Sequence, residues 1–306
     1  MNEGLIKAAI DIGSNSLRLL IVEFDDAENI KEIKRDLKTT RLAQGIKETG
    51  LLREDAVNKT LEVLKSWLDE LTYYNVNTVR MAATSAVRDA KNKNEFLEQL
   101  KQMGLNCEVI QGMKEAQLTY LGATHQWQGE PLIFDLGGGS MELISQAANI
   151  VRSCSLGAVK IFEHFCDKEG RIKDPGTINH YLSTELDTCM PEEELSLLRE
   201  TIQKGEKTLG VGGTATCLAQ IYLKQPVYKK ETIHGSFIPT HGLKQLVVQL
   251  NAIKMEERVE KYYVPRERSD IIVAGGWLIY YLVEFLGAEG FYVSDNDMLL
   301  GLILED

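Results

Sequence analysis

Long apolar segments are missing from this 306-residue sequence. No run approaches the ~20 apolar residues that a membrane-spanning helix needs. The first residues, 1–4, also lack the basic, then apolar, then small-residue order of a signal peptide. We therefore expect a cytoplasmic protein without a membrane partner.

Cysteine is scarce, with five residues spread widely and no C-x-x-C pair among them. This pattern predicts neither a disulfide framework nor a zinc site, and we expect the cysteines to fill the core. The five histidines are equally dispersed and show no metal-ligand spacing. We expect structural or surface roles for them.

Positive charge is in deficit, because 34 Lys and Arg face 45 Asp and Glu and give a net charge of −11. Nucleic-acid-binding proteins normally carry a basic patch or stripe, so we expect no nucleic-acid partner. A polyanionic substrate would have to be held by a few locally placed cations and backbone N–H groups. We interpret the lysine-rich stretches 31–38, 91–93 and 229–230 as solvated faces rather than as a track for such a substrate.

Apolar strands and amphipathic helices alternate along the chain. Apolar residues at steps of three and four predict a helix within 53–74, and a second helix is expected from a cap at Thr84 or Ser85 to about Met103. Strands alternating with helices predict an α/β chain with covered sheets. We place a domain boundary so that the domains are 1–125 and 126–306.

An internal repeat joins the two halves. Asp11–Arg18, with the sequence DIGSNSLR, aligns with Asp135–Glu142, with the sequence DLGGGSME, 124 positions later. Each copy follows an apolar strand and precedes further apolar residues. The repeat predicts two related domains whose loops face one another across a cleft.

The composition of these loops fits phosphate binding. Glycine and small residues in a tight turn let backbone N–H groups converge on an anion. The Asp at each strand end offers a carboxylate for a hydrated divalent cation. At the eighth position Arg18 can grip phosphate oxygens, whereas Glu142 can hold a metal or a water. The alternative is that both are simple glycine hairpin turns.

A third glycine segment, Gly210–Thr216, stands between a predicted strand and a predicted helix. The N-terminus of a helix beneath a glycine turn is a ready anion site. We interpret this segment as another wall of the same cleft.

At this point the sequence resembles the exopolyphosphatase and guanosine pentaphosphate phosphohydrolase (Ppx/GppA) family. The motifs that carry the resemblance follow in the family's order along the whole chain. They are residues 9–18 (AIDIGSNSLR), 41–45 (RLAQG), 83–88 (ATSAVR), 111–116 (QGMKEA), 135–142, 155–158 (SLGA), 210–216 (GVGGTAT) and 268–275 (RSDIIVAG).

The resemblance implies two actin-like (ribonuclease H-like) ATPase-fold domains around a central cleft that binds the phosphate chain and Mg²⁺, with Mn²⁺ as an alternative ion. This chain looks like the minimal two-domain form, in which the last helix packs back on the first domain. Relatives commonly form homodimers. Departures from the family pattern are Lys114, where an acidic residue is common, Met141, where Thr is common, and the absence of a Gly-Leu-Arg motif within 293–301.

The resemblance also assigns roles to individual residues. Glu115 is the expected general base, Arg88 the expected phosphate clamp, and Glu142 a possible partner base. Asp135 and Glu142 are expected to hold the metal. The expected phosphate-binding residues are Asp11, Gly13, Ser14, Asn15, Ser16, Arg18, Gly137, Gly138, Gly139, Ser140, Gly212, Gly213 and Thr214.

The expected function is release of terminal orthophosphate from inorganic polyphosphate. Hydrolysis of guanosine pentaphosphate is a close alternative, since the phosphate loops would serve both. An actin-like kinase or ATPase predicts an adenine pocket and an acceptor-activating Asp, which the sequence does not display. An inactive polyanion sensor conflicts with the intact set of Glu115, Asp135, Glu142 and Arg88.

Overall fold

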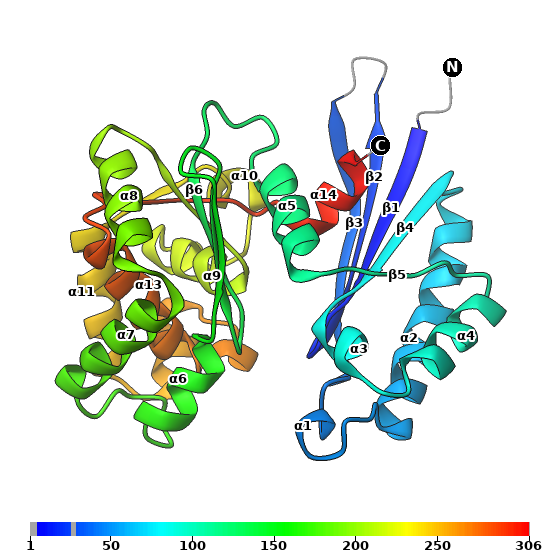
Figure 1. The fold of residues 1–306 in the computed structure, drawn as a ribbon, viewed down its shortest axis with the longest axis horizontal. Coiled ribbons are helices and arrows are strands. Elements are labelled where there is room, and N and C mark those ends of the chain that lie inside the picture. The colour runs from blue at the N-terminus through cyan, green and yellow to red at the C-terminus, as the bar shows by residue number, and fades with distance from the viewer. Residues whose placement is uncertain (1–4, 26–28, 306) are drawn as a thin grey trace. The chain divides into compact units, whose positions relative to one another are not determined.

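A computed structural model describes residues 5–25 and 29–305. The chain divides into two compact units, one formed by residues 1–122 with 297–306 and the other by residues 123–296. Each unit is built around its own sheet, as Figure 1 shows. Among the described residues, no helix combines the length and apolar character needed to cross a membrane.

The first unit contains a five-stranded sheet in the order β3-β2-β1-β4-β5. β1 pairs antiparallel with β2 and parallel with β4. The elements are β1 (Leu5–Ile12), β2 (Ser16–Phe24), β3 (Ile30–Thr39), α1 (Ile46–Thr49), α2 (Glu54–Tyr73), β4 (Thr78–Ala83), α3 (Ser85–Asp89), α4 (Lys93–Gln102), β5 (Glu108–Val109), α5 (Gly112–Ala123) and α14 (Met298–Leu304).

Helix α2 covers one face of this sheet. Its buried residues include Val57, Leu64, Trp67 and Leu71, which follow the helical period of the sequence and join the core formed by β1, β2 and β4. The Trp67 indole N–H donates to Asp36 Oδ2 on β3 at 3.0 Å. The apolar stripe therefore fixes α2 on the sheet.

The last helix, α14, supplies the second core of this unit. Its buried side chains, among them Leu299 and Leu302, pack with residues of β1, β2, β4 and α5. Glycines allow α14 to cross α5 at close range. A Cβ at Gly122 would lie 1.9 Å from the Asp297 carbonyl oxygen, and a Cβ at Gly301 would lie 1.9 Å from the Leu118 carbonyl oxygen.

The helix expected from Thr84 or Ser85 to Met103 is wrong as a single element. The structure breaks it into α3 and α4, and Thr84 makes no side-chain capping bond. The break is used for tertiary bonding: the Asn92 side chain accepts from Leu52 N at 2.8 Å and donates to Leu52 O at 3.0 Å. A distant segment thus ends α3 where the local pattern favoured continuation.

The second unit contains a six-stranded sheet in the order β10-β11-β9-β6-β7-β8. Read from the other edge, and without the edge strand β10, the order is β8-β7-β6-β9-β11. This is the order of the first sheet, with β6, β7, β8, β9 and β11 in the places of β1, β2, β3, β4 and β5. The elements are β6 (Leu132–Leu136), β7 (Met141–Ser145), β8 (Ile150–Cys154), α6 (Ala158–Phe165), α7 (Pro175–Cys189), α8 (Glu192–Gln203), β9 (Thr208–Val211), α9 (Gly213–Tyr222), α10 (Lys230–Ile233), β10 (Phe237–Pro239), α11 (Thr240–Asn251), α12 (Met255–Tyr262), a 3₁₀ turn (Arg266–Arg268), α13 (Ile272–Phe285) and β11 (Gly290–Val293).

Helix α13 lies at the centre of the second core and is buried along most of its length. Two glycines let its neighbours approach closely. A Cβ at Gly275 would lie 2.7 Å from Thr214 Cγ2, and a Cβ at Gly276 would lie 2.9 Å from Val247 Cγ2. Helices α9 and α11 therefore pack directly on α13.

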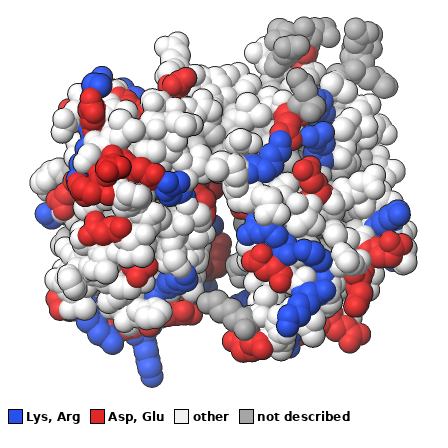
Figure 2. All heavy atoms as spheres, in the orientation of Figure 1, with Lys and Arg blue, Asp and Glu red and all other residues white. Residues whose placement is uncertain are grey.

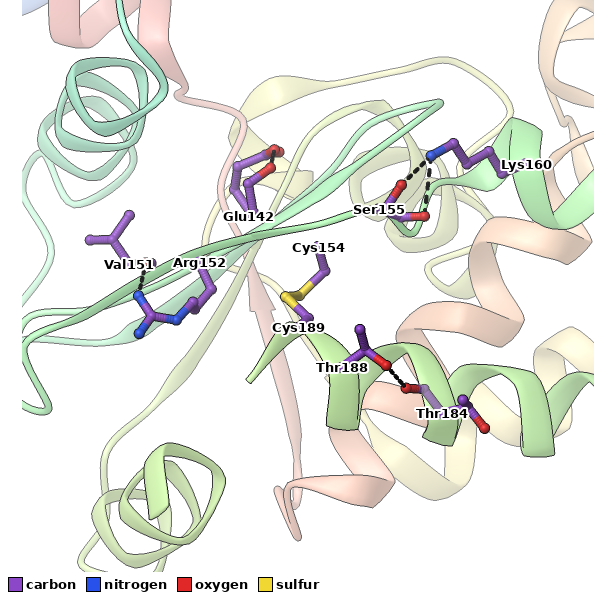
Figure 3. The surroundings of a disulfide bond; sticks show 10 residues. Glu142, Val151, Arg152, Cys154, Ser155, Lys160, Thr184, Thr188 and Cys189 are labelled. Atoms are coloured by element: carbon purple, nitrogen blue, oxygen red, sulfur yellow. Dashed lines mark hydrogen bonds between the residues drawn. A yellow bond between two sulfur atoms is a disulfide. The ribbon is translucent and has the colours of Figure 1, made fainter. Parts of the chain in front are cut away.

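The cysteine expectation is wrong at one pair. Figure 3 shows a disulfide between Cys154, at the end of β8, and Cys189, at the end of α7. The two residues are 35 positions apart, so no local sequence motif predicts the bond. Cys107, Cys166 and Cys217 are free thiols.

Candidate functional site

The first glycine loop is a tight hairpin between β1 and β2. Gly13 N donates to Ser16 O at 3.1 Å, and a Cβ on Gly13 would lie 2.9 Å from that same oxygen. Only glycine therefore allows this turn without a shift. The Asn15 and Ser14 carbonyls accept from Thr40, Arg41 and Ala43 amides at 2.8 to 3.1 Å, which anchors the loop.

Arg18 is held between two carboxylates in the first unit. Its Nε and Nη2 contact Asp11 Oδ2 at 2.8 and 2.7 Å, while Nη1 contacts Asp297 Oδ2 at 2.5 Å. Asp11 and Arg18 are cross-strand partners in the β1–β2 register. Asp297 caps α14 by accepting from Leu299 N at 3.0 Å. The structure thus links the loop to the last helix of the chain.

Asp297 is a site residue that the sequence reasoning missed. In the sequence, Asp297 lies within residues 293–301, which lack the Gly-Leu-Arg motif of the family. The available signal was an Asp directly before the apolar run 298–300, which is typical of a helix N-cap. Its partnership with Arg18 joins residues 279 positions apart.

Asp11 lies at the end of β1 with only 3% of its surface exposed. Its Oδ1 atom is buried without a hydrogen-bond partner among the described residues. Burial raises the pKa of Asp11, while the Arg18 guanidinium opposes that rise. Burying a carboxylate with one oxygen lacking a hydrogen bond destabilises the folded state. Such a residue is typical of a binding site rather than of a position that serves stability alone.

A small cavity of about 240 Å³ lies beside the first loop. Ser14 and Ser85 both line it, and their Oγ atoms are 2.9 Å apart. Ser85 begins α3, so the hydroxyls of two separate motifs meet here. Asn15 and Ser16 are at the tip, where Asn15 Nδ2 donates to Ser16 Oγ at 3.2 Å.

Arg88 and Glu115 both lie in the first unit. Arg88 Nη1 donates to Ile110 O at 3.2 Å, just before the segment that begins α5, and Nε contacts Asp89 Oδ1 at 3.3 Å. Glu115 is half-buried in the first turn of α5. A carboxylate in the first turn is favoured by the helix dipole. The neighbouring Lys114, a departure from the family pattern, forms an ion pair with Glu305.

The second glycine loop has the same construction as the first. Gly137 N donates to Ser140 O at 3.0 Å, and Asp135 pairs with Glu142 across β6 and β7 as Asp11 pairs with Arg18. The repeated sequence thus folds into two hairpins with the same turn and the same register. Two unrelated glycine turns would not share both features.

The carbonyls of the second loop face helix α6. Gly137 O and Gly138 O accept from Ala158 N at 3.0 Å and Val159 N at 2.9 Å. A Cβ on Gly157 would lie 2.3 Å from Gly138 O, so glycine permits this contact. Gly139 is exposed, and a Cβ there would meet nothing within 4 Å.

Glu142 and Asp135 are half-buried on neighbouring strands of the second unit. Glu142 Oε1 accepts from Ser153 Oγ on β8 at 2.7 Å, and Figure 3 shows Glu142 near the end of that strand. Asp135 lies against the third glycine segment, because a Cβ on Gly212 would be 2.9 Å from Asp135 Oδ1. The structure therefore brings two of the sequence motifs together.

The third glycine segment begins helix α9. Gly212 has a φ of 92°, a conformation that favours glycine. Gly213 is covered by Arg268, because a Cβ there would lie 2.1 Å from Arg268 Nη2. Thr214 is buried, and its side chain packs against Gly275 of α13. Its hydroxyl consequently belongs to the core, and an anion would meet its backbone N–H instead.

Arg268 opens the sequence motif 268–275, and Arg266 and Glu267 beside it are typical of ordinary charged surface. The 3₁₀ turn places its guanidinium over the first residue of α9. Gly213, the first residue of α9, has no side chain that would exclude the Arg268 guanidinium. Arg268 therefore places a cation against the third segment.

Within the lysine-rich stretch 31–38, cations are paired with acids. Lys34 Nζ contacts Glu70 Oε2 at 2.6 Å, and Arg35 Nη2 contacts Glu32 Oε2 at 3.1 Å. On the face shown in Figure 2, lysines and arginines stand among aspartates and glutamates. Within residues 5–25 and 29–305, no group of three or more His, Cys, Asp or Glu is placed to hold a metal ion.

Comparison with known proteins places this chain among phosphatases. The model of the Ppx/GppA phosphatase family matches residues 20–305. The chain is 31% identical to a bifunctional 3-dehydroquinate synthase/phosphatase of Fusobacterium nucleatum, covering 98% of this chain and 46% of that protein. It is 29% identical to exopolyphosphatase 2 of Mycobacterium tuberculosis, covering 97% of each. It is 28% identical to a guanosine-5'-triphosphate,3'-diphosphate pyrophosphatase of Aliivibrio fischeri, covering 96% of this chain and 58% of that protein.

The chain thus spans about half the length of the Fusobacterium nucleatum and Aliivibrio fischeri relatives and nearly all of the Mycobacterium tuberculosis exopolyphosphatase 2. Among solved structures, the Aquifex aeolicus member of the Ppx/GppA family is similar, with a TM-score of 0.78, 30% identity, and 98% of this chain and 96% of that chain covered. The predicted α/β class with actin-like construction is confirmed. The protein belongs to the Ppx/GppA phosphatase family, as its motifs predicted.

Proposed function

We propose that this protein is an exopolyphosphatase, which hydrolyses the terminal phosphoanhydride of inorganic polyphosphate and releases orthophosphate. The observation that carries the proposal is the pair of matching hairpins, each with a glycine turn, a strand-end Asp and a charged partner across the strands. The relative of nearly equal length named exopolyphosphatase 2 supports the same substrate class.

The two hairpins have unequal roles in this proposal. The turn 13–16 and the turn 137–140 present backbone N–H groups and hydroxyls to phosphate oxygens. Gly212 and Gly213 present the start of α9 to a more distal phosphate. Since Arg18 is held by Asp11 and Asp297, a phosphate contact by Arg18 would compete with those two ion pairs.

The donors of the second hairpin fit a hard divalent cation. Asp135 and Glu142 offer two half-buried carboxylates from adjacent strands, and Mg²⁺ usually takes one or two carboxylates together with waters and substrate phosphates. Mg²⁺, or Mn²⁺ in its place, would neutralise charge on the phosphate oxygens when bound. The Ser153 hydroxyl orients Glu142 through its hydrogen bond.

Glu115 is proposed as the general base that takes a proton from the attacking water. Phosphoryl transfer demands positioning and charge neutralisation more than covalent work by the protein. Arg88, fixed by its bond to Ile110 O, would bind the phosphoryl oxygens as charge shifts during transfer. These roles derive from the family motifs and are supported by the location of both residues in the first unit.

The proposal also includes the domain boundaries, the cellular location, the oligomeric state and an alternative substrate. The working domains would be 1–125 and 126–306, with the last helix returning to the first. The protein would act in the cytoplasm as a homodimer without a nucleic-acid or membrane partner. Guanosine pentaphosphate is the alternative substrate, which the similarity to the Aliivibrio fischeri pyrophosphatase favours.

The deciding experiment measures phosphate release from polyphosphates of several lengths, guanosine pentaphosphate and ATP, each with and without Mg²⁺. We expect Mg²⁺-dependent release from polyphosphate. Glu115→Gln should lower kcat about 100-fold or more while substrate affinity is kept, and Gln117→Ala, at an exposed position of the same helix, should leave kcat near that of the wild type.

Each other outcome has a defined meaning. Faster release from guanosine pentaphosphate would select the alternative substrate, and hydrolysis of ATP alone would select an ATPase. Binding without release would indicate a sensor. Near-normal turnover by Glu115→Gln would contradict the assignment of the general base.

A further inference from the structure

A second cavity, of about 460 Å³, lies in the unit formed by residues 123–296. Its walls come from the end of α9, one face of α11 and the end of α12. Helix α9 has ten residues and starts at the glycine segment. At 1.5 Å per residue the cavity therefore lies about 15 Å from that segment, which makes it a site separate from the proposed phosphate loops.

The floor of the cavity is apolar and firmly placed. Ile221 and Leu246 are 3% and 6% exposed, and both line the cavity. Gly242, Gln245, Leu246 and Gln249 follow the helical period, so a single face of α11 forms one wall. The two glutamine side chains stand at the rim of an apolar floor.

Aromatic rings also line the cavity, those of Tyr222, Tyr262 and Tyr263. Gly242 lets the Tyr222 ring lie directly against α11, since a Cβ there would be 2.8 Å from Tyr222 Cε2 and 2.9 Å from its hydroxyl oxygen. The position of this ring is therefore set by the packing of α9 on α11.

Two lining residues have an unfavourable backbone conformation. Lys224 has a φ of 53° and Tyr263 a φ of 59°, and they are two of the six non-glycine residues with positive φ in the described chain. Each conformation is held by a backbone bond, from Lys224 N to Ile221 O at 3.0 Å and from Tyr263 N to Arg258 O. Both residues lie just beyond the last turn of a helix, α9 or α12, where the left-handed conformation is a common helix ending, and both line the cavity.

The cavity also carries positive charge. Lys224 and Lys261 both line it, and Lys261 Nζ is 2.6 Å from Glu257 Oε1. Lys224 forms no ion pair with any residue in the described part of the chain. Aromatic rings stack with heterocyclic bases, carboxamides bond to the edge of a base, and ammonium groups attract phosphate.

We propose that this cavity binds a purine nucleoside monophosphate, with the base between the tyrosines and the glutamines and the phosphate near Lys224. The volume is within the range of small-molecule sites. The cavity is separate from the glycine segment, and the proposal does not depend on which phosphoanhydride the enzyme hydrolyses.

Calorimetric titration of the full-length protein with AMP, GMP and ribose 5-phosphate tests the proposal. We expect AMP or GMP to bind at least tenfold more tightly than ribose 5-phosphate. Gln249→Trp should fill the cavity and weaken nucleotide binding at least tenfold. Val248→Trp, at an exposed neighbouring position outside the cavity, should leave binding unchanged.

Three results would overturn the proposal. One is failure of both nucleotides to bind at millimolar concentration, and another is equal binding of ribose 5-phosphate. The third is unchanged nucleotide binding by Gln249→Trp, which would place the nucleotide at the phosphate loops. Phosphate release from polyphosphate, measured on the same variants, reports on the proposed function independently of these binding results.

Discussion

At the scale of single residues, Arg258 shows how a buried charge can organise a domain. It lies on α12 with 0% of its surface exposed. Its guanidinium donates to the carbonyls of Leu250 at 2.9 Å, Ser269 at 2.7 Å, Gly170 at 3.2 Å and Ile253 at 3.3 Å. Burial lowers the pKa of Arg258 from its ordinary value. Four carbonyls from three segments of the chain accept hydrogen bonds from this one side chain.

Replacing this arginine should therefore be costly. Arg258→Met leaves several buried carbonyls without donors, and we expect a loss of more than about 3 kcal/mol in the free energy of unfolding. Arg266→Met, at an exposed arginine nearby, should change it by no more than about 0.5 kcal/mol. Urea unfolding of both variants measures the difference. Equal stability of the two would show that the buried hydrogen bonds contribute little.

At the scale of elements, the disulfide ties α7 to the strand beside Glu142. Cys154 follows Ser153 on β8, and the Ser153 hydroxyl donates to Glu142. The bond closes a loop across 35 positions that contains α6 and α7. Of these two helices, α7 contacts β8, while the first amides of α6 bond to Gly137 O and Gly138 O. The bond therefore anchors a helical segment next to a proposed metal ligand.

Reduction of this bond should weaken the second unit. Chain entropy for a loop of this length predicts a loss of about 4 kcal/mol on reduction. We expect dithiothreitol to lower the thermal midpoint of the wild type, and Cys189→Ser to show the lower midpoint with or without the reductant. Thiol titration of the denatured, unreduced protein should find the three free cysteines. Five reactive thiols would contradict the bond.

At the scale of the whole molecule, the chain passes between its units twice, after residue 122 and after residue 296. The final crossing returns Leu299, Leu300 and Leu302 to the core beside β1 and β2. The first unit therefore cannot complete its core from N-terminal residues alone. Its stability depends on residues 298–304, which are distant in the sequence.

Two half-buried histidines should make the whole protein sensitive to mild acid. Burial lowers the pKa of His234, with Lys230 and His125 adding to the effect and Asp295 opposing it, and burial also lowers the pKa of His125. His234 Nδ1 accepts from Asp295 N at 3.2 Å, a bond that protonation of Nδ1 would remove. The folded state binds fewer protons than the unfolded state below the ordinary value of 6.5. Stability is thus full above that pH and is lost as pH falls through it.

We expect the thermal midpoint to fall between pH 7.5 and pH 5.5. His234→Asn keeps an acceptor near Nδ1 but cannot titrate, so it should reduce the dependence on pH. His180→Asn, at an exposed histidine, should keep the full dependence. Scanning calorimetry across this pH range distinguishes the variants. An unchanged slope in His234→Asn would assign the acid sensitivity to other groups.

Local patterns in the sequence determined much of the fold and the family. The apolar runs predicted β1, β2 and β6 because alternating or continuous burial follows directly from strand geometry. The repeat of Asp, Gly and Ser predicted two domains with related loops, and the structure gives these loops matching registers, Asp11 with Arg18 and Asp135 with Glu142. These features depend on residues within a few positions of one another. The roles assigned to the site residues stay predictions.

Only the tertiary structure decided which distant side chains meet. Asp297 reaches Arg18, Arg268 covers Gly213, and Cys154 bonds to Cys189 across long separations. None of these pairs leaves a periodic signal, because each is set by how helices pack on the two sheets rather than by local backbone preference. We expected Arg18 to bind phosphate. In the folded protein its guanidinium forms ion pairs with Asp11 and with Asp297, the N-cap of the last helix.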